Sequence, residues 1–253
     1  MKINLNGLIL READYGEKDK IINVLTGSNG IISAIVKGAK SAGHKKSSMV
    51  QCFAYGDFLL YVRKNGYALD DFEIKELFWG IREDLYNLSL AQYFSQLCFA
   101  FSPDESSSSE LLRLLLNVLF YISNGKKSLE VLKAIFELRG CSICGYMPNL
   151  TGCVHCKKYE SSKMYFSPEN GVLICGDCLK KTLECQRFTA DFLSGASLAA
   201  LRHIVYSDFN KLFSFSVSKP IEKELEYISE KYVRCHLGSN FRALDFYKSL
   251  FLN

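Results

Sequence analysis

The sequence has no long hydrophobic run and none of the glycine-rich motifs that hold a nucleotide phosphate. A membrane-spanning helix needs about 18 uninterrupted apolar residues, and the chain of 253 residues contains no such run. Residues 1–6 do not form the apolar core of a secretory signal peptide. Gly-x-Gly-x-x-Gly and Gly-x-x-x-x-Gly-Lys-Ser/Thr are both missing. We therefore expect neither a membrane protein nor a nucleotide-binding enzyme.

Catalytic histidine patterns are missing as well. A zinc deaminase needs His-x-Glu and a later Pro-Cys-x-x-Cys, and neither half occurs. The four histidines share no spacing typical of a catalytic or metal-binding triad; they are His44, His155, His203 and His236. We expect that the protein is not an enzyme.

Hydrophobic and cysteine residues, by contrast, are plentiful. A hydrophobic content of 48% with 13% aromatic residues can fill a packed core, so we expect a folded protein. Ten cysteines would suggest disulfides in a secreted chain. Because residues 1–6 do not read as a secretory leader and four of the cysteines have metal-ligand spacing, we expect the reducing cytoplasm.

Two Cys-x-x-Cys pairs predict one metal site. Cys153/Cys156 and Cys175/Cys178 are separated by eighteen residues, and four thiolates at this spacing can hold one tetrahedral Zn²⁺. Residues 164–167 and 172–174 read as a short hairpin that carries the second pair, as in a zinc ribbon. Such a site leaves no open coordination position, so we expect a structural zinc. Four buried thiols or a redox pair are the alternatives.

A third pair, Cys141/Cys144, leaves the choice of ligands open, since six thiols are too many for one zinc ion. This pair lies at the end of a predicted helix, where core packing accounts for such residues. His155 lies between two of the four predicted ligands, where binding is sterically awkward. We expect it to be exposed.

The positive charge is concentrated in one region. Between Val36 and Lys64 the sequence has six basic residues and one acid, Asp57, so 6 − 1 = +5, which exceeds the +4 of the whole chain. Such a region is typical of a phosphate-binding surface. The predicted DNA-binding residues are Lys37, Lys40, Lys45, Lys46, Arg63 and Lys64. Bases could stack on Phe53, Tyr55, Tyr61 or Tyr67. The alternative is a solvated loop beside core aromatics.

Residues 1–80 read as five short strands joined by turns. The predicted strands are 5–11, 20–25, 31–36, 58–62 and 67–74. This pattern predicts a small closed barrel, either the OB-fold that commonly binds oligonucleotides or an SH3-like barrel.

Residues 81–253 follow the period of helices. The predicted helices are 81–101, 111–122, 129–138, 189–209, 222–234 and 241–252, with a polar break at 102–109. The zinc-ribbon-like segment, about 150–181, is inserted among them. The fold class is therefore α+β, with an N-terminal five-stranded OB-fold barrel and a helical domain.

Several short segments together carry a resemblance to a known family: Gly7–Arg11, Asp14–Asp19, Gly30–Ala34, Lys37–Lys40, Arg82–Leu85, Phe136–Leu138, Gly145-Tyr146, Pro148, Leu150 and His236–Gly238. Through these segments, which follow one another in the family's order, the chain resembles the RecO family of bacterial DNA repair and recombination mediator proteins over almost its whole length. The pair Cys141/Cys144 is not part of the family pattern.

The resemblance implies an OB-fold, a helical domain and a zinc-binding insertion. It also implies binding of single- and double-stranded DNA and annealing of complementary strands. With RecR, such a protein helps to load RecA onto DNA coated by single-strand-binding protein, and it acts in the cytoplasm at the nucleoid. The alternative function is a zinc-ribbon scaffold for protein–protein assembly that does not bind DNA.

Overall fold

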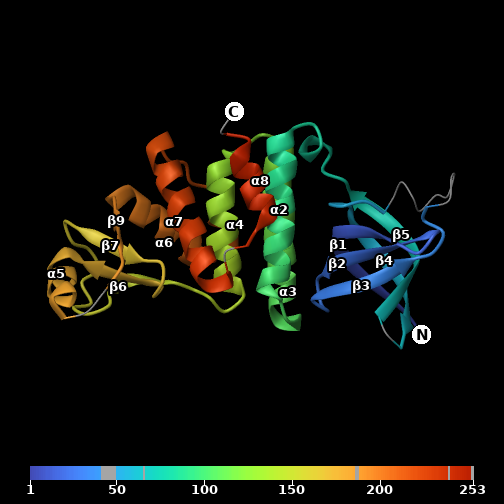
Figure 1. Cartoon of the computed structure of the whole chain (residues 1–253), viewed down its shortest axis with the longest axis horizontal. Coiled ribbons are helices and arrows are strands. Elements are labelled where there is room, and N and C mark those ends of the chain that lie inside the picture. Colours follow the sequence, from blue (N-terminus) through green and yellow to red (C-terminus); the bar gives the residue numbers. More distant parts are fainter. Residues whose placement is uncertain (41–49, 65, 186–187, 239, 252–253) are drawn as a thin grey trace. The chain divides into compact units, whose positions relative to one another are not determined.

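The computed structural model describes residues 1–40, 50–64, 66–185, 188–238 and 240–251 (Figure 1). The chain forms two compact units. Unit 1 comprises Met1–Lys126 with Phe241–Asn253, and unit 2 comprises Lys127–Asn240. The division into domains at residue 80 stays a prediction. No helix of the described ranges is long and apolar enough to cross a membrane.

Five strands close the N-terminal barrel in the order β1-β2-β3-β5-β4. All neighbours are antiparallel except β3 and β5, which pair in parallel through Ala34 with Tyr67 and Ile35 with Ala68. This five-stranded closed barrel is the architecture of an OB-fold, so the predicted fold class is confirmed. The strands are β1 (Lys2–Tyr15), β2 (Asp19–Thr26), β3 (Ile31–Val36), β4 (Tyr55–Arg63) and β5 (Gly66–Glu76).

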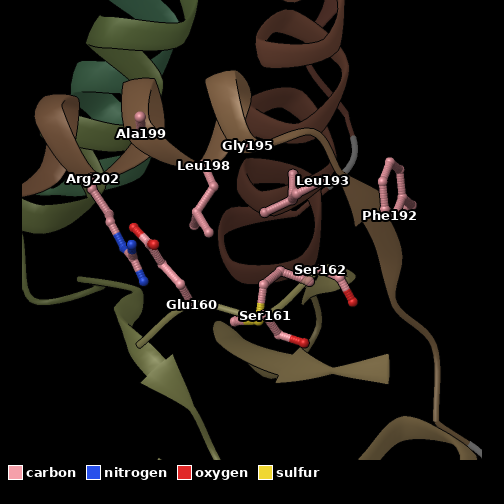
Figure 2. Close-up of a pocket in the computed structure, with 10 residues that line it drawn as sticks. Glu160, Ser161, Ser162, Phe192, Leu193, Gly195, Leu198, Ala199 and Arg202 are labelled. Atoms are coloured by element: carbon pink, nitrogen blue, oxygen red, sulfur yellow. The ribbon is translucent and has the colours of Figure 1, made fainter. Parts of the chain in front are cut away.

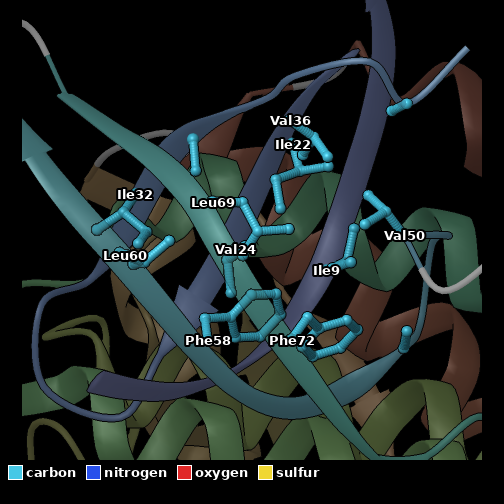
Figure 3. Packing of buried hydrophobic residues seen from close by; sticks show 13 residues of the cluster. Ile9, Ile22, Val24, Ile32, Val36, Val50, Phe58, Leu60, Leu69 and Phe72 are labelled. Carbon is cyan, nitrogen blue, oxygen red and sulfur yellow. The ribbon is translucent and has the colours of Figure 1, made fainter. Parts of the chain in front are cut away.

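Alternate residues of the strands fill the barrel interior (Figure 3). Along β3, Ile32, Ala34 and Val36 are buried, whereas Ser33 between them is exposed. Such alternation places successive side chains on opposite faces of a strand. Within this cluster the rings of Phe58 and Phe72 stack with their centroids 4.1 Å apart. The cluster is completed by Ile9, Ile22, Val24, Ala39, Val50, Ala54, Leu60 and Leu69.

A β-bulge interrupts β1 between Ile9 and Arg11. Ile9 pairs on its other side with the segment before β4, because its N–H donates to Ala54 O and its carbonyl accepts from Phe53 N. Leu10 is the extra residue, and it is buried like Ile9. The bulge resets the alternation, so Arg11 is exposed on the outer face of the barrel.

Unit 1 continues with helices. They are η1 (Trp79–Ile81), α2 (Leu85–Phe101), α3 (Glu105–Ser123) and, near the end of the chain, α8 (Arg242–Ser249). The predicted polar break at 102–109 is wrong for residues 105–109, which form the start of α3. Asp104 explains this, because its carboxylate accepts from Ser107 N at 2.8 Å and caps the helix. Hydrogen bonds, first from the Ser107 hydroxyl, lower the pKa of Asp104 to about 2.

Unit 2 combines helices with a small sheet. Its longer helices are α4 (Leu129–Ile143), α6 (Gly195–Tyr206) and α7 (Lys219–Leu237), and its shorter ones are α5 (Gly176–Cys185) and the 3-10 helix η2 (Phe209–Lys211). The sheet has the order β6-β8-β7-β9. Its strands are β6 (Asn149–Cys153), β7 (Met164–Ser167), β8 (Val172–Cys175) and β9 (Asp191–Leu193).

The hairpin predicted for the zinc segment is confirmed as β7 and β8, which pair antiparallel from Met164–Cys175 to Ser167–Val172. The helix predicted for 189–209 is wrong at its start. Residues 191–193 form β9 against β7 instead, and Ser194 caps α6 by accepting from Ser197 N. Because the β9 residues Phe192 and Leu193 are apolar, they continued the helical pattern that the sequence showed.

Helices α4 and α7 pack around buried charges. The Lys133 ammonium and the Glu137 carboxylate are both fully buried and lie 3.0 Å apart. Lys133 also contacts Glu230 at 3.2 Å, and Ser229 Oγ donates to Glu137. Buried charges must be paired and hydrogen-bonded, because their removal from water is costly. The network therefore fixes how α4 faces α7.

We expect Lys133→Met to lower the free energy of unfolding by about 3–5 kcal/mol, because it leaves the Glu137 carboxylate buried without its cation. The control is Lys231→Met, which breaks the partly exposed pair with Asp191 and should cost less than about 1 kcal/mol. Urea unfolding followed by far-UV circular dichroism measures both. Equal losses would show that the buried network does not hold α4 on α7.

Candidate metal centre and nucleic-acid surface

The four predicted cysteine ligands lie together in unit 2. The Sγ atoms of Cys153, Cys156, Cys175 and Cys178 are all within 4.8 Å of one another. Cys156 Sγ and Cys175 Sγ are 3.7 Å apart. Zinc–sulfur bonds of about 2.3 Å in a tetrahedron place the sulfurs about 3.8 Å apart. The cluster can therefore hold a metal ion, and its donor set suits Zn²⁺.

The first pair of ligands is held by a tight turn at the end of β6. Cys153 N donates to Lys158 O, and Lys157 N donates to Cys153 O, both at 2.9 Å. A Cβ on Gly152 would lie 2.9 Å from the carbonyl oxygens of Lys157 and Lys158, so only glycine allows this approach. Lys157 has a φ of 61°, in the left-handed region that favours glycine.

The second pair is held where β8 passes into α5. Cys175 ends β8, and its N–H donates to Cys153 Sγ at 3.4 Å, which joins the two turns. Cys178 lies in the first turn of α5, where the positive end of the helix dipole favours a thiolate. Thr182 Oγ1 donates to Cys178 O one turn later.

Three of the four thiols have pKa values shifted from the ordinary value of a cysteine. Burial raises the pKa of Cys153, but hydrogen bonds from the backbone N–H groups of Cys156, Cys175 and His155 outweigh it and lower the value to about 6. Burial, followed by the neighbouring thiols, raises the pKa of Cys178 to about 12 and raises that of Cys175. One thiolate therefore makes the next harder to form, and a bound divalent cation removes this repulsion.

The other candidate ligands lie outside the cluster. Cys141 is fully buried in α4, and burial raises its pKa. Cys144 is half-buried at the C-cap of the same helix. His155 is exposed, as expected, and its Nε2 lies 3.3 Å from Thr182 Oγ1. None of these residues belongs to the four-sulfur group found among the described residues.

Arg202 of α6 holds the segment around the first turn in place. Its Nε donates to Leu150 O at 2.8 Å and its Nη2 to Tyr159 O at 2.6 Å. The guanidinium also lies 3.7 Å from the centroid of the Tyr159 ring. Figure 2 shows Arg202 and Glu160 at the rim of a pocket of about 290 Å³, with Leu193 and Leu198 on its walls.

The predicted DNA-binding residues occupy different environments. Lys37 is exposed directly after β3, and Arg63 and Lys64 are exposed at the turn between β4 and β5. Lys40 is paired instead, because its Nζ lies 3.0 Å from Asp14 Oδ2 and donates to Gly16 O. Lys45 and Lys46 lie outside the described residues.

The strand register relates these basic residues to the outer face of β1, β2 and β3. Arg11 pairs with Asn23, and Asn23 pairs with Ser33; Asn23 Nδ2 also donates to Ser33 Oγ at 2.7 Å. A Cβ on Gly66 would lie 3.3 Å from Ser33 O, which places the β4–β5 turn beside the middle of β3. Lys37 follows four residues later, about 13 Å further along the strand direction.

Arg11 is the residue of this face that the sequence analysis did not single out. The apolar run before it concealed that the bulge at Leu10 turns Arg11 outward. Of the four predicted stacking residues, Phe53 is wrong because it is fully buried. Tyr67 packs partly against the barrel core, whereas Tyr61 is exposed with Lys2 4.8 Å from its ring centroid.

Comparison with known proteins identifies both parts of the chain. Residues 1–78 match the family model for the N terminal of recombination protein O, and residues 82–245 match the model for its C terminal. A protein named DNA repair protein RecO from Acetivibrio thermocellus is 32% identical over 248 residues, 98% of this chain and 97% of its own length. A protein of the same name from Alkaliphilus metalliredigens is 29% identical over 251 residues, 99% of this chain and all of its own length.

We expect Lys157→Gly to stabilise unit 2 by about 1 kcal/mol, because glycine adopts the left-handed conformation without strain. The matched control is Lys158→Gly, one residue later, where φ is not positive and glycine only adds freedom to the unfolded chain. Thermal unfolding measures both variants. Destabilisation by Lys157→Gly equal to that by Lys158→Gly would contradict the strain at Lys157.

Proposed function

Because the chain belongs to the RecO family of DNA repair proteins, we propose that it binds single- and double-stranded DNA on the outer face of its barrel. The observation that carries this proposal is the set of exposed cations around β3: Arg11, Lys37, Arg63 and Lys64. They flank a strand face whose central polar groups are Asn23 and Ser33. This arrangement binds phosphates without reading the base sequence.

In our proposal the basic loop, residues 37–46, adds lysines to this surface. By sequence, Lys45 and Lys46 belong to this loop. The start of the loop is held to the β1–β2 turn by hydrogen bonds. There Gly38 N donates to Asp19 Oδ1 at 2.8 Å, and Lys40 N donates to Lys18 O. The described base of the loop, next to Lys37, is therefore held in place. Lys40 contributes less charge, because Asp14 already neutralises it.

Annealing of complementary strands follows from the same charges. A surface that neutralises phosphates on two strands lowers their mutual repulsion and brings them together. In our proposal the protein acts with RecR to load RecA onto DNA coated by single-strand-binding protein, in the cytoplasm at the nucleoid. It does so by binding and positioning, without enzymatic activity.

The metal that we propose for the four cysteines is a structural Zn²⁺. Four sulfur ligands fill a tetrahedral zinc ion and leave no position for a substrate. The thiolates come from two turns that are joined by the bond from Cys175 N to Cys153 Sγ. When bound, the ion balances the charges of the thiolates and thereby keeps β6, β8 and α5 together.

We expect the single variant Lys37→Ala and the double variant Arg63→Ala/Lys64→Ala each to lower the affinity for DNA and to make that affinity less dependent on salt. Each lost phosphate contact should lower the slope of log K against log salt by about 0.7 for a single strand. Lys40→Ala should change the slope less, because Asp14 pairs with it. Fluorescence anisotropy of a labelled single strand at two salt concentrations measures these effects.

The control for this experiment is Lys75→Ala, a barrel lysine whose charge is paired with Asp57 at 2.7 Å. A variant that combines Lys37, Lys40, Lys45 and Lys46 changed to Ala tests the loop as a whole. Unchanged binding by both this variant and the Arg63/Lys64 variant would remove DNA from the barrel face. No binding by the wild type at low salt would instead favour the assembly scaffold.

We expect the purified chain to hold about one Zn²⁺, and Cys175→Ser to lose it, as measured by metal analysis. Cys144→Ser is the control and should keep the metal, since Cys144 lies outside the cluster. Removal of the ion should loosen unit 2, seen as faster hydrogen exchange in β6 and α5. DNA affinity of the barrel should persist, because the barrel belongs to the other unit. Loss of zinc in Cys144→Ser would contradict the ligand set.

A further inference from the structure

One end of the helices in unit 1 carries exposed apolar side chains that DNA binding does not use. Trp79, the only tryptophan of the chain, has 60% of its surface exposed, and Phe251 has 57%. Leu85 and Tyr86, in the first turn of α2, are exposed as well. We call these four residues the apolar end of unit 1.

Contacts within unit 1 bring the members of the apolar end together. Tyr86 contacts the chain after α8, because its ring centroid lies 4.9 Å from that of Phe251 and its hydroxyl donates to Leu250 O. Figure 1 shows α8 beside α2. Trp79 belongs to η1, which is tied to the same turn of α2 because Asn87 Nδ2 donates to Gly80 O at 3.2 Å.

The backbone that presents Trp79 is fixed. A Cβ on Gly80 would lie 2.1 Å from Ser123 O, so η1 packs directly on the end of α3, and Gly80 N donates to Ser123 Oγ. Arg82 donates to Leu77 O and Cys52 O while its guanidinium faces the Trp79 ring at 5.5 Å. An exposed aromatic on a rigid frame loses little entropy when a partner covers it.

In the stretch of chain that carries Trp79, Leu85 and Tyr86, residues 76–86, acidic residues outnumber basic ones. Glu76, Glu83 and Asp84 are exposed within this short stretch of chain. Glu76 and Asp84 are held in place by backbone N–H groups, those of Leu77 and Phe78 for Glu76 and those of Tyr86 and Asn87 for Asp84. Arg82, the one cation of the stretch, is directed toward backbone carbonyls.

These charges select the occupant. Phosphates would be repelled by three carboxylates, so the apolar end does not continue the DNA surface. Trp and Tyr are the residues that most often dominate protein–protein binding energy when they insert into a partner's pocket. Carboxylates around them favour a partner with complementary positive charge.

We propose that the apolar end of unit 1 is a docking surface for a protein that presents an apolar recess bordered by Lys or Arg. This inference rests on the proposed function, in which the DNA-bound protein acts together with a protein partner. The apolar end is the surface that we assign to that contact. DNA and the partner are thereby assigned to different surfaces of unit 1.

The single tryptophan makes the test direct, and the probe is RecR from the same genome with any tryptophan changed to Phe. When RecR is added to the full chain, Trp79 emission should shift to shorter wavelength and its quenching by acrylamide should fall. A short single strand of DNA should leave both signals unchanged. Trp79→Ala and Glu83→Lys should each weaken RecR binding at least tenfold, measured with fluorescently labelled RecR.

The matched control variants change residues of α2 and α3, which also belong to unit 1. Phe99→Ala removes another exposed aromatic side chain, in α2 and with 40% of its surface exposed, about 20 Å along the helix from Leu85. Glu110→Lys reverses an exposed charge on α3. Both should bind RecR within twofold of the wild type. Far-UV circular dichroism checks that all four variants are folded.

The outcomes separate the docking surface from the proposed function. If the wild type binds RecR and Trp79→Ala and Glu83→Lys bind equally well, the docking surface is wrong and the RecR partnership stands. If the wild type does not bind RecR, both are overturned. A Trp79 signal that responds to DNA, or a self-association in sedimentation that Trp79→Ala abolishes, would assign the apolar end to DNA or to a second copy and overturn the proposal.

Discussion

The short parallel pairing of β3 with β5 is the constraint on which the proposed DNA surface depends. It closes the barrel through only two residue pairs, Ala34 with Tyr67 and Ile35 with Ala68. This pairing brings the β4–β5 turn beside Ser33, so that Arg63 and Lys64 come to the same strand that leads into Lys37. Gly66 makes this approach possible, because it has a φ of 104° and little space beside Ser33 O. Without closure, the basic residues would belong to two unrelated hairpins.

Charge repulsion among four sulfurs plays the corresponding role in unit 2. The turns around Cys153 and Cys175 are built from backbone hydrogen bonds that stabilise thiolates, yet burial and the three neighbouring thiols raise the pKa of Cys178. The divalent cation that we propose would resolve this conflict by binding all four thiolates. Arg202 then holds the first turn from outside, through the carbonyls of Leu150 and Tyr159. The buried pair of Lys133 and Glu137 shows the same principle, a buried charge kept by its partner.

The periodic parts of the fold could be predicted from the sequence, and the parts set by contacts between distant residues could not. The strand 31–36 agrees with β3 at both ends, because alternate residues face a barrel core. The four thiols were evident from their spacing. The strand β9 was missed because its three residues pair with β7 across a distant stretch of chain. The bulge that turns Arg11 outward and the pairing of Lys40 with Asp14 also depend on tertiary contacts. A count of basic residues therefore overstated the charge of Lys40 and left out Arg11.

Unit 1 separates two kinds of surface by charge and by chemistry. Around β3 the exposed groups are cations and hydrogen-bonding side chains, which suit a phosphate chain that slides and exchanges. Around η1 they are aromatic rings among carboxylates, held on a backbone that Gly80 and Arg82 fix in place. In the proposed function the protein brings DNA strands together and releases them, and binding through phosphates allows this because counterions compete for every contact. Burial of apolar rings against the proposed protein partner is insensitive to that competition. The two surfaces are thus suited to two contacts of different lifetime on one unit.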